Sequence, residues 1–215
     1  MEKIVLENFS VGGKCNIFHH GVLNDCLQKS NYSFNAGNLY GVIGEFGNGG
    51  AALSCGITGK ADYYEGNIYI DGNESFFDEL KNISWYIGDD LKKKRNFLKK
   101  EMTVKEQIIY GLNHYNRGYD LEIIKQQFNL STERIDRCIE YVSGERWKAS
   151  CAIGYANGKK IFCFPLMNTN DYNLFGEQFK SILNVLLDSM CIVIMPTTKE
   201  DNIKKISSNY SILYL

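Results

Sequence analysis

The stretch most suited to chemistry is a glycine-rich segment at residues 44–51, which reads Gly-Glu-Phe-Gly-Asn-Gly-Gly-Ala. Its glycine spacing matches a phosphate-binding loop, whose backbone N–H groups cradle an anion. The candidate nucleotide-binding residues are Gly44, Gly47, Asn48, Gly49, Gly50 and Ala51. A complete loop of this kind has a lysine that reaches the phosphates, followed by a serine or threonine that holds Mg²⁺. Here these two positions are Gly50 and Ala51, so the sequence predicts the shape of an anion site without its cation or metal ligand.

The segments around this loop have the pattern needed to position it. Residues 38–43 form a short apolar run typical of a buried strand, and residues 51–54 can begin a helix. Two further continuous apolar runs, at 160–164 and 191–195, are typical of parallel strands that helices cover on both faces. The segment between them, residues 174–188, is amphipathic and predicts one such helix.

The rest of the chain predicts more strands and one helical region. The expected strands are residues 2–10, 31–37, 67–72, 83–88 and 210–215, with the first ending at a break formed by Gly12 and Gly13. Between residues 103 and 141, apolar side chains recur at helical spacing in a Lys-, Glu- and Gln-rich background. The sequence therefore indicates a single domain of residues 1–215, with a core of 1–91 and 151–215 and a helical subdomain of about 92–150.

The balance of charged residues indicates which kinds of partner the protein does not attract. The 24 basic and 25 acidic side chains nearly cancel, so the overall charge attracts neither nucleic acid nor an anionic membrane. The basic run at residues 92–95 lies beside Asp89 and Asp90, which favours a solvated face over a nucleic-acid site. Seven scattered cysteines are typical of reduced thiols in the cytosol, and no run approaches the roughly 20 apolar residues of a membrane span. Any membrane role is therefore expected to be peripheral.

A metal site is not expected from the histidines and cysteines. His19 and His20 are adjacent, so on a strand they point apart, and Cys15 and Cys26 do not form a close pair with them in sequence.

Four further segments give the sequence a family resemblance. Residues 65–72 are similar to the strand "s-G-x-I-x-I-d-G" of the ABC ATPase family, and residues 102–108 are similar to its helix start "l-T-V-r-E-N-I". Residues 142–146 resemble the signature "L-S-G-G-E-R", and residues 152–167 resemble "A-R-A-L-A-x-x-P-K-I-L-L-L-D-E-P". The resemblance implies an α/β fold: a P-loop NTPase-type sheet flanked by helices, an ABC-type antiparallel β subdomain and a helical insert.

The resemblance also implies which catalytic groups are missing. The metal-linked aspartate of this family falls on Pro165, and the glutamate that acts as its general base falls on Leu166. The switch histidine falls at about Thr197, and the Q-loop glutamine at about Asp89. Since phosphoryl transfer depends on positioned charge, we expect no catalytic residue, no metal site, weak or absent ATP binding and no Mg²⁺.

Two candidate contacts with nucleotide remain. The signature of this family acts on the ATP held by the partner subunit, and its candidates here are Ser143, Gly144 and Glu145. Two registers are open: Ser143 takes the serine position and Gly144 the first glycine, or Val142 and Ser143 take them. Phe18 is the candidate for stacking on adenine.

Three functions follow from this interpretation. The leading hypothesis is a hydrolysis-incompetent nucleotide-binding subunit of an ABC transporter, in the cytoplasm at the inner face of the membrane. It would pair with a second ABC ATPase subunit, as a homo- or heterodimer, and couple to a membrane permease. The alternatives are a scaffold protein that keeps only the fold, and an ATPase with displaced ligands. Thermal stability measured with and without nucleotide separates the last two.

Overall fold

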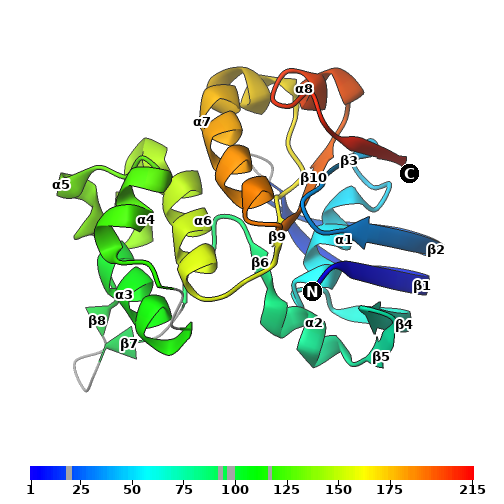
Figure 1. The fold of residues 1–215 in the computed structure, drawn as a ribbon. Coiled ribbons are helices and arrows are strands. Elements are labelled where there is room, and N and C mark those ends of the chain that lie inside the picture. Colours follow the sequence, from blue (N-terminus) through cyan, green and yellow to red (C-terminus); the bar gives the residue numbers. More distant parts are fainter. Residues whose placement is uncertain (18–20, 92–93, 96–99, 116–117) are drawn as a thin grey trace. The chain divides into compact units, whose positions relative to one another are not determined.

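A five-stranded parallel sheet forms the centre of the unit made of Met1–Tyr86 and Lys160–Leu215 (Figure 1). Its strand order is β11-β3-β10-β9-β6. The bounds are β3 Leu39–Ile43, β6 Ser84–Tyr86, β9 Ile161–Cys163, β10 Ile192–Thr197 and β11 Ser211–Tyr214. The apolar runs at 38–43, 160–164 and 191–195 supply three adjacent strands, and every residue of β9 and β10 is buried, as a parallel sheet requires.

The structure, a computed structural model, describes residues 1–17, 21–91, 94–95, 100–115 and 118–215. The chain divides into two compact units. The first consists of Met1–Tyr86 and Lys160–Leu215, and the second of Ile87–Lys159. The predicted helical subdomain of about 92–150 lies inside the second unit, which begins earlier and ends later than that prediction.

An antiparallel sheet of order β2-β1-β4-β5 completes the strands of the first unit. Its bounds are β1 Lys3–Ile17, β2 Gly21–Asn35, β4 Tyr63–Ile70 and β5 Asn73–Ser75. The first two strands form a long hairpin ladder whose register runs from Lys3 opposite Asn35 to Ile17 opposite Gly21. Strand β2 is therefore much longer than the predicted strand at 31–37, because its pairing with β1 continues through a largely exposed polar stretch.

The predicted break at Gly12 and Gly13 is wrong, since β1 continues through both residues. A Cβ atom on Gly12 would lie 2.6 Å from the Tyr63 hydroxyl oxygen, and one on Gly13 would lie 2.6 Å from the Asp62 carboxylate. These glycines let the side chains of Tyr63, in β4, and of Asp62, just before it, approach the β1 backbone closely. Glycine within a strand often marks such a close approach.

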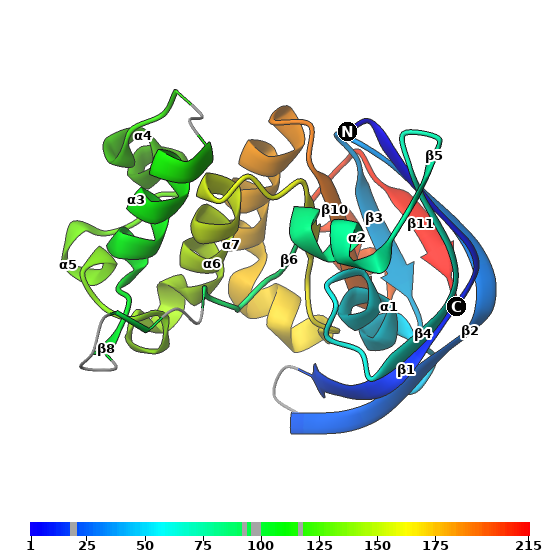
Figure 2. The same ribbon diagram turned by 90° about the horizontal axis from the view of Figure 1, so that it is seen from below.

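Helix α1 lies between the two sheets of the first unit, as Figure 2 shows. All residues of α1, Gly50–Ile57, are buried, so the helix directly after the glycine-rich segment is the centre of the hydrophobic core. The other helices of this unit are α2 Phe77–Ile83, α7 Thr169–Asp188 and α8 Glu200–Lys204. Helix α7 confirms the amphipathic prediction at 174–188 and begins earlier, where Asn168 and Asp171 form a capping box. Helices α2 and α8 and strand β5 are too short for a periodic signal and have no counterpart in the prediction.

The second unit is mainly helical. Its bounds are β7 Lys94–Arg95, β8 Lys100–Glu101, α3 Val104–Tyr115, α4 Leu121–Gln127, α5 Thr132–Ile135, α6 Arg146–Ala156 and the single 3₁₀ turns η1 Ile139–Tyr141 and η2 Ser143–Glu145. Helix α6 packs on α3, where Asn157 Nδ2 donates to the Gln107 carbonyl at 3.2 Å. This packing makes α6 part of the helical unit.

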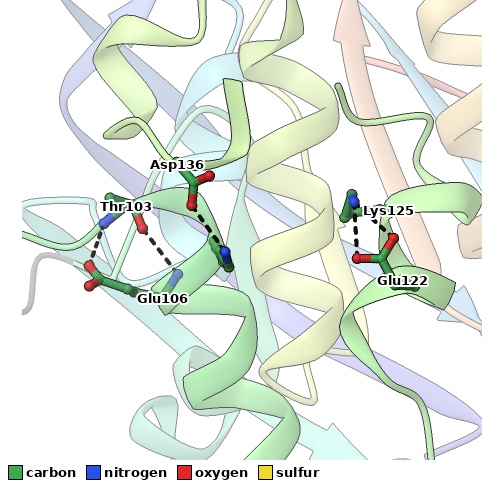
Figure 3. A network of polar contacts seen from close by, with 6 residues as sticks. Thr103, Glu106, Glu122, Lys125 and Asp136 are labelled. Carbon is green, nitrogen blue, oxygen red and sulfur yellow. Dashed lines mark hydrogen bonds and ion pairs between the residues drawn. The ribbon is translucent and has the colours of Figure 1, made fainter. Parts of the chain in front are cut away.

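Polar contacts fix the beginning of α3 (Figure 3). The Thr103 hydroxyl accepts from the Glu106 N–H at 3.2 Å, and the Glu106 carboxylate accepts from the Thr103 N–H at 3.0 Å. This reciprocal capping box explains physically why a Thr-x-x-Glu sequence begins a helix. Lys105 pairs with Asp136 at 3.3 Å and Lys125 with Glu122 at 2.8 Å.

Among the helices of the described residues, none is long and apolar enough to cross a bilayer.

Candidate functional site

The glycine-rich segment lies at the carboxyl end of β3, beside the ends of β9 and β10. Ligands of open parallel sheets bind at this edge. The Gly44 N–H donates to the Thr197 carbonyl at 3.1 Å, which ties the start of the loop to the end of β10. The Asn48 N–H donates to the Glu45 carbonyl at 3.1 Å, so the tip is a closed turn. Strand, loop and helix thus follow one another as the sequence predicts.

The loop has an exposed half and a buried half. Residues 45–48 are exposed, whereas Gly49, Gly50 and Ala51 are buried. Gly47 and Gly49 both have left-handed backbone, with φ of +93° and +98°. Positive φ at these two positions is the physical reason for the glycine spacing.

The carboxylate of Asp25 lies on the loop. Asp25 is only 1% exposed, and its two oxygens accept from the N–H groups of Gly49 and Ala52, each at 2.9 Å. It is located on β2, opposite Gly13, on the inward face together with Leu27. Since Gly49 is the N-cap residue of α1 and has no side chain, Asp25 supplies the helix cap from a different strand.

The β2 backbone also lies against the loop. A Cβ atom on Gly49 would be 2.7 Å from Leu27 Cα and 3.0 Å from the Cys26 carbonyl oxygen. Gly49 is therefore needed for close approach of two backbones as well as for its φ. Asp25 and this contact have no counterpart in the sequence prediction, because they depend on which residues of β2 lie over α1.

The residue at the lysine position has apolar neighbours. A Cβ atom on Gly50 would lie 3.2 Å from Pro196 Cβ, 3.8 Å from Leu166 Cδ1 and 3.8 Å from Leu215 Cδ1. We call Pro196, Leu166 and Leu215 the apolar cluster. Leu166 is 1% exposed. The structure thus brings Gly50, the predicted lysine position, close to Leu166, the predicted base position, and neither residue has a polar side chain.

The polar groups next to this cluster are already hydrogen-bonded to each other. The Thr197 hydroxyl donates to the Met167 carbonyl at 3.1 Å and accepts from Asn202 Nδ2 at 2.9 Å. The Ser54 hydroxyl donates to the Phe164 carbonyl at 2.8 Å and joins α1 to the end of β9. Thr197, the approximate position predicted for the switch histidine, is fully buried and makes both of its hydrogen bonds inside the fold.

These residues do not fit a magnesium ion. Ala51 has no hydroxyl, Pro165 has no carboxylate, and no group of three or more metal-ligating side chains occurs in the part of the chain that the structure describes. Magnesium prefers oxygen ligands in octahedral geometry, so the donor set for it is missing on this edge of the sheet.

The signature candidates lie at the start of α6. Ser143 and Gly144 are exposed, and no atom lies within 4 Å of the position of a Cβ on Gly144. Val142, in contrast, is 2% exposed. The Glu145 carboxylate binds residues of its own unit: it accepts from the Ser131 N–H at 3.1 Å and forms an ion pair with Arg134 at 3.5 Å.

Asp89, the approximate position predicted for the Q-loop glutamine, is bound to Ser150 through its backbone carbonyl. The Ser150 hydroxyl accepts from the Gly88 N–H and donates to the Asp89 carbonyl, both at 2.8 Å. Phe18, His19 and His20 lie outside the described residues, as do the side chains of the basic run at 92–95.

The cysteines of the central strands belong to the core. Cys163 and Cys191 are fully buried, and burial raises the pKa of the Cys163 thiol. A thiol in this environment is a poor nucleophile.

Comparison with known proteins gives the family. A family model described as ABC transporter matches residues 27–164, which is more than half of the chain. The chain belongs to the ABC transporter family. The match includes the glycine-rich loop and extends through β9, and the architecture around the loop is that of the family's ATP-binding domain.

Individual relatives are distant. The chain is 22% identical over 192 residues to the vitamin B12 import ATP-binding protein BtuD of Vibrio atlanticus (strain LGP32), covering 86% of this chain and 73% of that protein. It superimposes on the ATP-binding subunit of an ABC transporter with a TM-score of 0.65 at 15% identity, covering 98% and 85% of the two chains. A dimeric bacterial ABC transporter cassette gives a TM-score of 0.63 at 18% identity, with coverages of 99% and 94%. These structures confirm the predicted α/β fold.

Proposed function

We propose that this ABC family member is a nucleotide-binding subunit that does not hydrolyse ATP itself. The observation that carries the proposal is the apolar cluster around Gly50, because it surrounds the predicted lysine position and includes Leu166, the predicted base position. Removing one preorganised catalytic group costs about 3 kcal/mol of transition-state stabilisation, and groups that act together fail together. Gly50, Ala51, Pro165 and Leu166 together leave no charged group or metal ligand for phosphoryl transfer.

The proposed role is to complete the ATP site of a partner. This chain pairs with an active ABC ATPase subunit and couples to a membrane permease, at the cytoplasmic face of the membrane. The dimeric cassette among the similar structures supports the pairing. The exposure of Ser143 and Gly144 supports the register in which these two residues meet the partner's ATP, because buried Val142 cannot offer its side chain.

The test is ATP turnover by the assembled transporter complex. Ser143→Ala removes the hydroxyl offered to the partner's ATP, and loss of one such donor predicts a fall in kcat of about 10²-fold. Glu133→Ala, an exposed change on α5 of the same unit, is the control and leaves kcat unchanged. Equal turnover by Ser143→Ala and the control would exclude the role in trans and favour the scaffold alternative.

A further inference from the structure

Two of the N–H donors that would make an anion site are already used inside this chain. In the phosphate-binding pattern, Gly49 is the last glycine of the loop and Ala52 follows the lysine and hydroxyl positions. The N–H groups of these two residues donate to the two oxygens of the Asp25 carboxylate, each at 2.9 Å. A carboxylate at this place meets the positive end of α1 with the same chemistry by which a phosphate would.

The position of Asp25 is fixed by the close approach of the β2 backbone to the loop and by the hydrogen bonds of its own carboxylate. The β2 backbone lies so near the loop that a Cβ atom on Gly49 would be 2.7 Å from Leu27 Cα and 3.0 Å from the Cys26 carbonyl oxygen. Asp25 itself is 1% exposed, and two backbone donors hold it, so leaving the loop would expose those donors without an acceptor.

We propose that Asp25 is a built-in competitor for the phosphate-binding loop. Its carboxylate takes two donors that the phosphates of a nucleotide would need, and its charge repels the polyphosphate of any nucleotide that approaches. The chain's own loop therefore excludes nucleoside polyphosphates and joins β2 rigidly to α1, so the subunit contacts nucleotide through Ser143 and Gly144 at the partner's ATP site. This inference deepens the proposed function and rests on it only for the family assignment of the loop.

The experiment follows the amide NMR signals of Gly49 and Ala52 in the full ¹⁵N-labelled chain. The probes are metal-free inorganic pyrophosphate and metal-free ATP. In the wild type, neither probe moves these two signals. Asp25→Asn keeps the shape of the side chain, removes its charge and leaves one of the two N–H groups without an acceptor, because the amide nitrogen only donates. Both probes should therefore move the signals saturably, at concentrations at least about tenfold lower than any effect in the wild type.

Asp71→Asn is the matched control. The Asp71 carboxylate also accepts from two backbone N–H groups, those of Glu2 and Lys3, at 2.6 and 2.9 Å, but it lies in the turn between β4 and β5. In the Asp71→Asn chain, neither probe should move the amide signals of Gly49 and Ala52. An equal gain of binding in Asp71→Asn would show that loosening of the antiparallel sheet, rather than Asp25, controls the loop.

Two results would overturn the inference. The first is a wild-type chain whose Gly49 and Ala52 signals move as readily as those of the Asp25 variants. The second is a folded Asp25→Asn chain, together with a folded Asp25→Ala chain, in which neither probe moves them. If neither variant folds, a through-hydrogen-bond coupling from the Gly49 amide to the Asp25 carboxylate in the wild type decides, and its absence counts against the inference. A loop that binds pyrophosphate could still lack hydrolysis, so this failure is distinct from failure of the proposed function.

Discussion

Two glycines of the loop have the same backbone conformation and different surroundings. Gly47 and Gly49 both have φ close to +95°, at +93° and +98°. Nothing lies within 4 Å of a Cβ on Gly47, whereas a Cβ on Gly49 meets Leu27 Cα at 2.7 Å. At the residue scale, the loop thus needs one glycine for conformation alone and another for conformation and space.

Alanine at the two positions separates these requirements. Gly47→Ala should lower the free energy of unfolding by about 1–2 kcal/mol, the cost of left-handed backbone in an L-residue. Gly49→Ala adds a steric conflict with β2 and should cost about 2–5 kcal/mol. Urea unfolding measures both values, and an equal loss in the two variants would contradict the described contact between Gly49 and Leu27.

At the scale of elements, helix ends decide where the chain turns. Helix α1 is capped by Asp25, which lies far away in the sequence on strand β2. Helix α7 is capped by Asn168, the residue directly before it. The Asn168 side chain accepts from the N–H groups of Asn170 and Asp171 at 2.8 and 3.2 Å. Only the local cap can be read from a sequence, because the distant cap depends on the fold.

The local cap predicts a measurable contribution. Asn168→Ala should lower the free energy of unfolding by about 1 kcal/mol. Lys199 is the N-cap residue of α8 and makes no capping hydrogen bond with its side chain, so Lys199→Ala should change stability by less than about 0.5 kcal/mol. Thermal or urea unfolding of the two variants gives the comparison, and a loss no larger than that of Lys199→Ala would rule out the capping contribution.

At the scale of the molecule, the positions on which the proposed loss of catalysis rests are distributed over several elements. Gly50 and Ala51 begin α1, Pro165 and Leu166 follow β9, and Pro196 lies in β10. The apolar cluster joins these elements around the lysine position. If the proposed function is right, a change in the loop alone does not restore phosphoryl transfer.

The double variant Gly50→Lys with Ala51→Ser tests this statement. It restores the loop cation and hydroxyl, yet hydrolysis in a single-turnover assay with ATP and Mg²⁺ should equal that of the wild type, because no carboxylate replaces Leu166. The double variant should also be less stable, since its lysine starts 3.2 Å from Pro196 Cβ. The single variant Ala51→Ser is the stability control. Hydrolysis well above the wild type would show that a displaced side chain supplies the base.

The sequence by itself determined the elements that rest on local patterns. Glycine spacing and apolar runs depend on neighbours in the chain, so they located the loop and the central parallel strands. Helical spacing after residue 103, with the family resemblance at residues 102–108, located the start of α3. Short elements such as α2 and α8 carry too few residues for a period, and the polar stretch of β2 before residue 31 carries no alternation strong enough to predict.

Only the tertiary structure decided what surrounds the loop. Gly12 and Gly13 indicate a turn in the sequence, but in the structure Tyr63 of β4 and the preceding residue Asp62 approach their backbone closely. Asp25 is an ordinary polar residue in the sequence, and the register of β1 with β2 places it on the loop donors. These features depend on contacts between residues far apart in the chain, which strand register and sheet packing set and which no local pattern encodes.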